Sequence, residues 1–152
     1  MADDVIARRA GRVLLLDGSG RVLLLHGHDP GRPGHEYWFT PGGGLDPGES
    51  SAAGAARELF EEAGLAVDPA VLGEPVWQEV TEFPFDGRRY RQSQEFFVLR
   101  VGSWQVDTSG FDEVEVGSID GHRWWSVAEL EGTAERYYPA ELPALLRTLL
   151  ES

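Results

Sequence analysis

Short aliphatic runs alternate with polar turns in the first part of the chain. The segment "RAGRVLLLDGSGRVLLL", residues 9–25, contains two such runs joined by Asp17-Gly18-Ser19-Gly20, a sequence typical of a hairpin turn. Two strands are predicted here. The next segment, "HGHDPGRPGHE", has no hydrophobic periodicity and is predicted to be a loop. The irregular spacing of His26, His28 and His35 favours solvated loop residues or ligand contacts over a metal site.

The second half of the chain repeats the strand pattern and ends on a helical one. The segments "EPVWQEVTEF" and "RRYRQSQEFFVLRV" are rich in β-formers and are separated by Phe85-Asp86-Gly87, which predicts a second hairpin. A polar segment, "DTSGFDEVEVGSIDG", leads to "HRWWSVAEL", and Tyr137-Tyr138-Pro139 is expected to pack the last helix against the sheet. Leucines at helical spacing behind Pro143 predict that closing helix. No internal repeat or linker is found, so residues 1–152 are expected to form one domain.

The segment between the two predicted hairpins indicates a helix. Pro47-Gly48 makes a turn, Ser50 or Ser51 can cap the helix, and the alanine-rich run from Ala52 to Ala63 favours helix until Gly64. At about 100° per residue, four apolar side chains form a buried stripe. They are Ala52, Ala56, Leu59 and Ala63.

Three glutamates, Glu58, Glu61 and Glu62, share a face of this helix next to the apolar stripe. Like charges at this spacing cost a few tenths of a kcal/mol per pair, and a solvated acidic face usually carries basic partners one turn away. The helix has only one cation, Arg57, which is expected to point beyond Glu61. A divalent cation would resolve the repulsion, because Mg²⁺ takes carboxylate oxygens and bridges to phosphates.

Composition narrows the possible chemistry. A chain of 152 residues with 41% hydrophobic residues is typical of one globular domain. The absence of cysteine excludes disulfides, thiolate catalysis and cysteine zinc sites, so a metal would be held by oxygen or histidine. The net charge of −13 opposes non-specific binding to nucleic acid. No apolar run approaches the ~20 residues that span a bilayer, and "MADDV" lacks the features of a signal peptide, so a cytoplasmic protein is expected.

The glutamate helix lies within a longer motif, from Gly43 to Leu65. Its residues fit the pattern G-x5-E-x7-R-E-U-x-E-E-x-G-U, where U is aliphatic, without a departure. This pattern is the Nudix box, and the chain resembles the Nudix hydrolase family. The order of the flanking segments also resembles the family, so the resemblance covers nearly the whole chain. The matching residues are Gly43, Glu49, Arg57-Glu58, Leu59, Glu61-Glu62, Gly64 and Leu65.

The resemblance implies an α/β fold in which a mixed β-sheet is sandwiched between helices, and an enzyme that hydrolyses a nucleoside diphosphate linked to another group. It implies Mg²⁺ or Mn²⁺ as cofactor and structural roles for Glu49 and Arg57, with the arginine pairing with the glutamates of the box. Homodimers are common in the family. The implied metal ligands are Glu58, Glu61, Glu62 and the carbonyl of Gly42.

A fourth catalytic carboxylate is expected outside the box, because a further acidic group can position or deprotonate the attacking water. Nudix enzymes often supply it from the loop before the late tryptophan-containing strand. Glu115 is the preferred candidate, since it lies eight residues before Arg123, a spacing that resembles similar members. A merely solvated acidic loop is the alternative interpretation. The other candidates are Glu113, Asp112 and Asp120 in the same segment and Glu95 in a predicted strand.

The sequence gives only general candidates for substrate binding. Trp38, Trp124 and Trp125 are expected in the core, although Trp38 is also a candidate for stacking on a base. The leading interpretation is a pyrophosphohydrolase of a small nucleotide such as a (deoxy)nucleoside triphosphate or nucleotide sugar. A non-catalytic, nucleotide-binding sensor is the alternative, and the acidic charge and short length disfavour RNA decapping. Arg88, Arg89 and Arg91 form either a phosphate-facing patch or a solvated hairpin tip.

Overall fold

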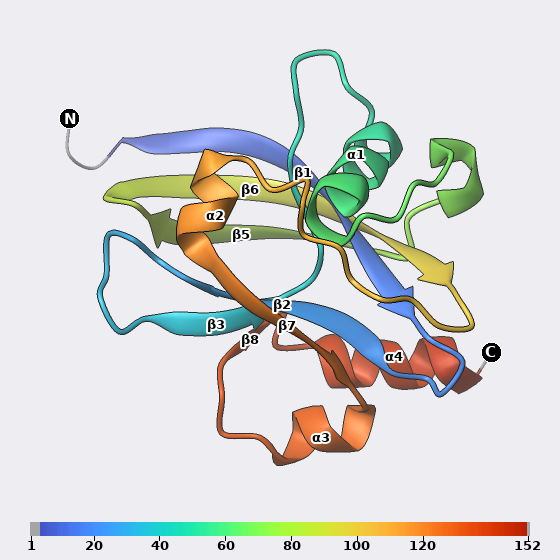
Figure 1. The fold of residues 1–152 in the computed structure, drawn as a ribbon. Helices are drawn as coiled ribbons and strands as arrows, with labels where there is room; N and C mark the ends of the chain where they lie inside the picture. The colour runs from blue at the N-terminus through green and yellow to red at the C-terminus, as the bar shows by residue number, and fades with distance from the viewer. Residues whose placement is uncertain (1–3, 152) are drawn as a thin grey trace.

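The computed structural model describes residues 4–151, so the ends of the predicted domain 1–152 lie outside the described residues. It is an α/β fold with a mixed sheet of eight strands in the order β5-β6-β1-β2-β3-β8, with β4 paired to β1 and β7 to β2. The sheet lies between α1 on one side and α3 and α4 on the other (Figure 1). The prediction of a mixed sheet between helices is confirmed.

The strands are β1 (Val5–Leu16), β2 (Val22–His28), β3 (Glu36–Phe39), β4 (Gly42–Gly44), β5 (Trp77–Phe85), β6 (Arg88–Arg100), β7 (Ile119–Trp125) and β8 (Tyr137–Tyr138). The helices are α1 (Ser51–Ala63), the 3₁₀ helix η1 (Pro69–Leu72), α2 (Glu113–Ser118), α3 (Val127–Gly132) and α4 (Leu142–Glu151). No helix within this part of the chain is both long and apolar enough to cross a membrane.

The central strand β1 has apolar residues at consecutive positions because helices cover both faces of the sheet. Val13 and Leu15 pack in the cluster that contains the apolar side of α1. Leu14 and Leu16 point to the other face, where they pack with residues of α3 and α4. β1 pairs in parallel with β6 over its whole length and antiparallel with β2 and β4. Residues from distant parts of the chain therefore meet on β1.

The ends of α1 agree with the sequence prediction. The Oγ of Ser50 accepts the N–H of Ala53 at 3.1 Å, and Gly64 ends the helix with φ of 76°. Gly11 on β1 allows the helix to approach closely, because a Cβ at this position would lie 2.3 Å from the carbonyl oxygen of Ser51. The predicted apolar stripe is buried except at Ala52, which is half-buried.

Two parts of the chain differ from the prediction. β2 continues to His28 and β3 begins at Glu36, so the expected loop is confined to residues 29–35. His26 and His28 are strand residues because they pair with Trp38 and Glu36 across the β2–β3 ladder. The acidic segment after residue 107 contains the short helix α2, which the sequence pattern did not indicate. Both hairpins are present as predicted.

Candidate active site

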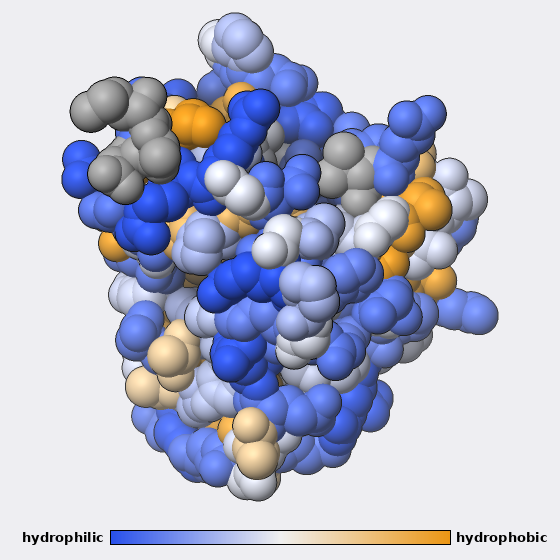
Figure 2. All heavy atoms as spheres, turned by 90° about the vertical axis from the view of Figure 1, so that its left-hand side faces the viewer, coloured by the Kyte–Doolittle hydropathy of each residue, from blue (hydrophilic) through white to orange (hydrophobic). Residues whose placement is uncertain are grey.

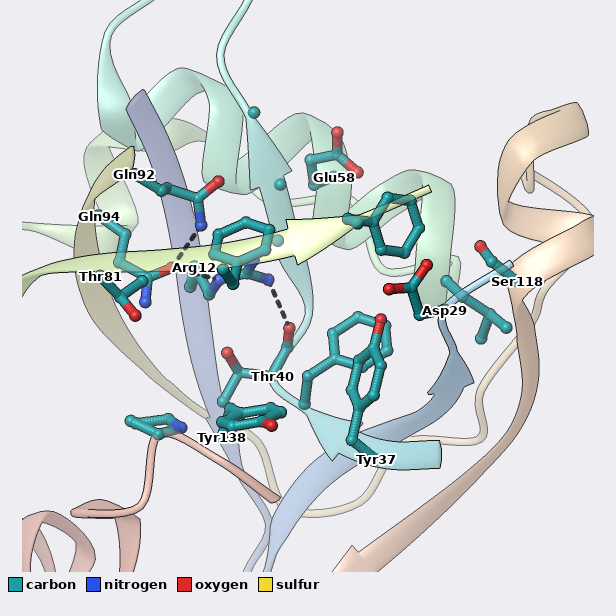
Figure 3. Close-up of a pocket in the computed structure, with 18 of the residues that line it drawn as sticks. Arg12, Asp29, Tyr37, Thr40, Glu58, Thr81, Gln92, Gln94, Ser118 and Tyr138 are labelled. Carbon is teal, nitrogen blue, oxygen red and sulfur yellow. Dashed lines mark hydrogen bonds between the residues drawn. The ribbon is translucent and has the colours of Figure 1, made fainter. Parts of the chain in front are cut away.

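A cavity of about 490 Å³ opens inside the curled sheet. β1, β5 and β6 form one wall, while β3 and β8, which lie at the other end of the strand order, face them. Figure 3 shows polar side chains from all these elements pointing into the cavity. The molecular surface on the side where the β5–β6 turn and the loop between β2 and β3 lie is mainly hydrophilic, with scattered apolar residues (Figure 2).

Glycines of β4 allow the glutamates of α1 to reach this cavity. Glu62 is 2% exposed and accepts the N–H of Gly42 through Oε1 at 2.7 Å. A Cβ at Gly43 would lie 2.9 Å from Oε1 of Glu58, so a larger residue would displace that carboxylate. The close approach of helix and strand therefore explains why the segment is built of consecutive glycines.

A cluster of carboxylates forms where α1 meets α2. Glu58, Glu61 and Glu115 each offer an oxygen, and these atoms lie within 4.8 Å of one another. Glu115 is held by a capping box: its Oε1 accepts the N–H of Asp112 at 2.9 Å, and its own N–H donates to Asp112 at 2.8 Å. The short helix thus brings the preferred fourth carboxylate to the glutamates of the box.

Three of the four rival carboxylates lie outside the cavity. Glu113 is exposed on α2, and Oδ1 of Asp120 contacts Nδ1 of His26 at 2.5 Å. Glu95 alternates on β6 with Gln94 and Phe96, which line the cavity, so it belongs to the opposite face of the strand. Of the five candidates, Glu115 and Asp112 are the ones that line the cavity.

Burial and mutual repulsion favour protonation of Glu58, Glu62 and Glu115. Burial, with the neighbouring charges of Glu115 and Glu61, raises the pKa of Glu58 to about 7. Burial also raises the pKa of Glu115, and it raises that of Glu62 well above the ordinary value. A bound cation would stabilise the ionised forms, and carboxylate oxygens are the ligands that Mg²⁺ and Mn²⁺ prefer. The donor set therefore fits a divalent cation.

Arg57 contacts two glutamates of the cluster and holds them in place. Its Nε and Nη2 each donate to a carboxylate oxygen of Glu49 at 2.9 Å, and Nη2 also donates to the carbonyl of Gly44 at 3.1 Å. Nη1 donates to Glu58 at 3.1 Å and lies 3.4 Å from Glu61. The expectation that Arg57 points beyond Glu61 was therefore wrong, because the guanidinium is turned back towards two of the glutamates.

Two arginines that the sequence analysis did not single out lie in the cavity wall beside the acidic cluster. Arg8 donates to Oε1 of Gln92 at 2.5 Å, and Arg12 donates to Oε1 of Gln94 at 2.7 Å and to the carbonyl of Thr40 at 3.1 Å. Burial lowers the pKa of both guanidinium groups. The sequence did hold a signal for this pair: Arg8 and Arg12 are at even positions of β1, like Ala10 and Leu14, so the alternation of a strand places them on one face.

Asp29 ties two loops together at the cavity. Its buried carboxylate accepts the N–H groups of Gly31 and Asp86 at 2.8 Å each and the Nε of Arg32 at 3.0 Å. Burial opposes ionisation, but these donors outweigh it and lower the pKa of Asp29. The loop after β2 is therefore fastened to the turn between β5 and β6.

The structure does not bring the four predicted substrate-binding residues to this cavity. Trp38 packs against His26 and Trp125, with ring centroids 4.7 and 5.2 Å away. Within the described chain, Arg88 and Arg89 are exposed on the first residues of β6, and Arg91 pairs with Glu82 at 3.1 Å.

Tyr138 was expected only to pack the last helix, but it lines the cavity, while its neighbour Tyr137 packs against the core. Of the histidines, His35 also lines the cavity. Ring nitrogens and carboxylate oxygens of His26, Glu36 and Asp120 lie within 4.8 Å of one another, although both carboxylates are exposed.

The curled mixed sheet, the acidic cluster and the arginines beside it define an α/β protein whose site suits a divalent cation and a phosphate-bearing ligand. A family model described as the NUDIX domain matches residues 6–147. The chain therefore belongs to the Nudix family, as the sequence motif indicated.

Relatives and solved structures agree with this assignment. An RNA pyrophosphohydrolase of Dinoroseobacter shibae is 35% identical over 64% of this chain. The match covers 66% of that relative, just under two thirds of its length. An RNA pyrophosphohydrolase of Acidiphilium cryptum is 39% identical over 79% of this chain and 76% of its own. The crystal structure of a MutT protein from Methanosarcina mazei has a TM-score of 0.70 and 22% identity, covering 97% of this chain and 96% of that one, which shows a shared fold.

Proposed function

We propose that this protein is a pyrophosphohydrolase that depends on Mg²⁺ or Mn²⁺ and cleaves a nucleoside diphosphate linked to another group, such as a (deoxy)nucleoside triphosphate or a nucleotide sugar. The observation that supports this best is the acidic cluster of Glu58, Glu61 and Glu115 beside a cavity that contains Arg8 and Arg12. The acidic cluster suits the cation of such a substrate complex, because carboxylates hold cations. The arginines suit its phosphates, because guanidinium groups bind phosphate oxygens.

Glu58, Glu61, Glu62 and the carbonyl of Gly42 would hold the cation. When bound, a divalent cation neutralises phosphate charge, orients the pyrophosphate and lowers the pKa of a coordinated water. Arg57, fixed by Glu49, keeps Glu58 and Glu61 in place.

The remaining steps use side chains of the chain itself. Arg8 and Arg12 lie close enough to Glu58 and Glu62 for their charges to interact, so a phosphate bound there would meet cations from β1. Glu115 would accept a proton from the attacking water. The water oxygen forms a new bond to phosphorus while the anhydride bond breaks, and the displaced phosphate group leaves with the bonding electrons.

An RNA substrate is the second candidate, because the two relatives reported above are named RNA pyrophosphohydrolases. A 5′-triphosphate on RNA has the same anhydride bonds as a free nucleotide. The net charge of −13 opposes association with a long polyanion, which favours the free nucleotide. The comparison is direct: phosphate or pyrophosphate release from 5′-triphosphorylated RNA against release from the matching nucleoside triphosphate.

A substrate panel tests the proposed function. The purified chain is assayed with Mg²⁺ or Mn²⁺ on nucleoside triphosphates, nucleotide sugars, ADP-ribose, NADH and dinucleoside polyphosphates. We expect hydrolysis of at least one, and a severe loss of turnover with an intact fold in Glu61→Gln or Glu62→Gln. Near-normal turnover in both variants would refute the site. Tight nucleotide binding without hydrolysis at any pH or metal tested would instead support the non-catalytic sensor.

A further inference from the structure

The wall of the cavity contributed by β5 contains an acidic side chain that the proposed hydrolysis does not use. Glu79 lines the cavity and is half-buried, and it lies on the same face of β5 as Thr81 and Phe83, which line the cavity too. Among residues 4–151, Oε2 of Glu79 is one of the buried side-chain atoms without a hydrogen-bond partner, and Oγ1 of Thr40 is another. An unsatisfied buried acceptor is costly, so such a group in a cavity wall indicates a missing donor.

The neighbours of Glu79 indicate which kind of ligand atom its carboxylate would bind. Gln94 receives N–H groups from Arg12 and from Gln92 at its Oε1, which leaves its Nε2 to donate to Glu79. Figure 3 shows Gln94 beside Gln92 and Thr81 in this part of the wall. Glu141 adds a second negative charge near Glu79. Burial and the charge of Glu141 raise the pKa of Glu79, so the ionised carboxylate lacks stabilising partners, and a ligand edge that presents N–H donors would supply them.

Aromatic residues line the cavity from both sides of this position. Phe83 and Phe85 come from β5, while Tyr37, Phe39 and Tyr138 come from β3 and β8. The ring centroids of Tyr37 and Tyr138 are 5.6 Å apart. Flat aromatic surfaces of this kind bind nucleobases by stacking.

Glu79 lies at a useful distance from the acidic cluster. Glu79 pairs with Gln94 on β6, Gln94 pairs with Ala10 on β1, and Ala10 pairs with Gly44 on β4, the strand whose Gly42 contacts Glu62. Three strand spacings of about 4.8 Å make roughly 14 Å along the sheet. A nucleoside di- or triphosphate is of this length, so its base can lie at β5 while its phosphates lie at β4.

We infer that Glu79 is a specificity-determining residue that binds guanine by accepting hydrogen bonds from the ring N1–H and the 2-amino group of the base. Among the common bases, guanine is the one that presents two adjacent N–H donors on one edge, matching the two oxygens of a carboxylate. Rotation about the last torsion of the side chain, which is soft in glutamate, turns the unpaired oxygen towards the cavity. This inference rests on the proposed function for the nucleotide class, and it adds the identity of the base.

Binding of nucleoside monophosphates tests the inference without any hydrolysis, because these compounds have no anhydride bond. Calorimetry measures the affinity of the full chain for GMP, for IMP, which lacks only the 2-amino group, and for AMP. We expect GMP to bind at least about tenfold more tightly than either, the scale of a hydrogen bond to a charged group. Equal affinities for the three nucleotides would overturn the inference.

Glu79→Gln keeps the shape of the side chain and removes its charge. We expect this variant to lose about 10- to 100-fold in GMP affinity and to bind GMP and IMP equally. Glu74→Gln, which makes the same charge change at an exposed position before β5, should bind GMP like the unchanged protein. Unchanged GMP affinity in Glu79→Gln, or preferred binding of AMP that depends on Glu79, would contradict the assignment. The nucleotide series on the unchanged protein decides the question even if the variant folds poorly.

A parallel assay of phosphate release separates this inference from the proposed function. If GMP is preferred through Glu79 while no anhydride is hydrolysed, the base assignment holds and the enzymatic proposal fails. If GTP, ATP, CTP and UTP are hydrolysed with equal kcat/KM and GMP is not preferred, the enzymatic proposal holds and the role of Glu79 is refuted.

Discussion

Replacing Glu115 with glutamine separates the chemistry of this side chain from its part in the fold. The capping box of α2 uses Oε1 of Glu115 as an acceptor for the N–H of Asp112, at 2.9 Å. The amide oxygen of glutamine can accept the same hydrogen bond, so α2 keeps its cap. The negative charge and the basic oxygen are lost, however, from a cluster whose members lie within 4.8 Å.

The expected effect on turnover is large and the expected effect on stability is small. Losing a general base lowers kcat by about 10²-fold or more, on a scale that extends to 10⁴. Glu115 is the second cause, after burial, of the raised pKa of Glu58, so that pKa should fall from about 7 towards its ordinary value in the variant. The melting temperature should change little, because a like-charge repulsion is removed while a hydrogen bond is kept.

Three measurements check this reasoning: steady-state kinetics on a good substrate, a melting curve, and carboxylate NMR titration of Glu58 in the metal-free protein. Glu113→Gln is the matched control, since Glu113 is exposed on the same helix. Full activity in Glu115→Gln with loss in Glu113→Gln or Glu95→Gln would move the assignment to that residue. Full activity in all three variants would show that no carboxylate outside the box activates the water.

Three further predictions follow from buried contacts. Asp29→Asn should destabilise the protein at neutral pH. Because the pKa of Asp29 is lowered in the folded state, the difference in unfolding free energy between the variant and the unchanged protein should be present above pH 3.8 and vanish as the pH falls further. Denaturation at several pH values measures it. Gly11→Ala should lower the free energy of unfolding by about 1–3 kcal/mol, since its Cβ would lie 2.3 Å from a carbonyl oxygen of α1. The control is Gly102→Ala, whose Cβ would meet nothing within 4 Å and which should have little effect. Arg57→Lys should not rescue the activity lost in Arg57→Ala, because lysine cannot reproduce the paired donation to Glu49, and equal kcat in the lysine variant and the unchanged protein would contradict this role.

The sequence was most informative where the structure depends on local contacts. The caps, length and acidic face of α1 follow from residues within one segment, and these predictions agree with the structure. The same holds for the hairpin at Asp86 and Gly87, both of which have positive φ. The turn of Arg57 towards Glu58 was implied by the family resemblance but not by the helical pattern alone, because its direction depends on Glu49, which lies outside the helix.

The cavity was less predictable because its residues meet through pairing between distant strands. Arg8 lies in the cavity wall because β1 pairs with β6 and places it beside Gln92, and no local pattern specifies that register. Glu79 looks like an ordinary polar residue of an alternating strand until the curled sheet turns it inward. The arginine patch near residue 90 was conspicuous in the sequence, but the alternation of β6 leaves Arg89 and Arg91 in solvent.

The parallel ladder between β1 and β6 also has a consequence for synthesis on the ribosome. Arg8 and Gln92 are 84 residues apart in the chain, so the longest ladder of the sheet cannot form until most of the protein has been made. At about 5–20 residues per second, this interval lasts on the order of 4 to 17 s. Throughout it the aliphatic run of β1 can pair with β2 and β4 but has neither its parallel partner β6 nor α4 to cover it. We therefore expect newly made chains to need protection from aggregation more at this stage than after release, since pairing of distant strands is slow and leaves apolar segments exposed.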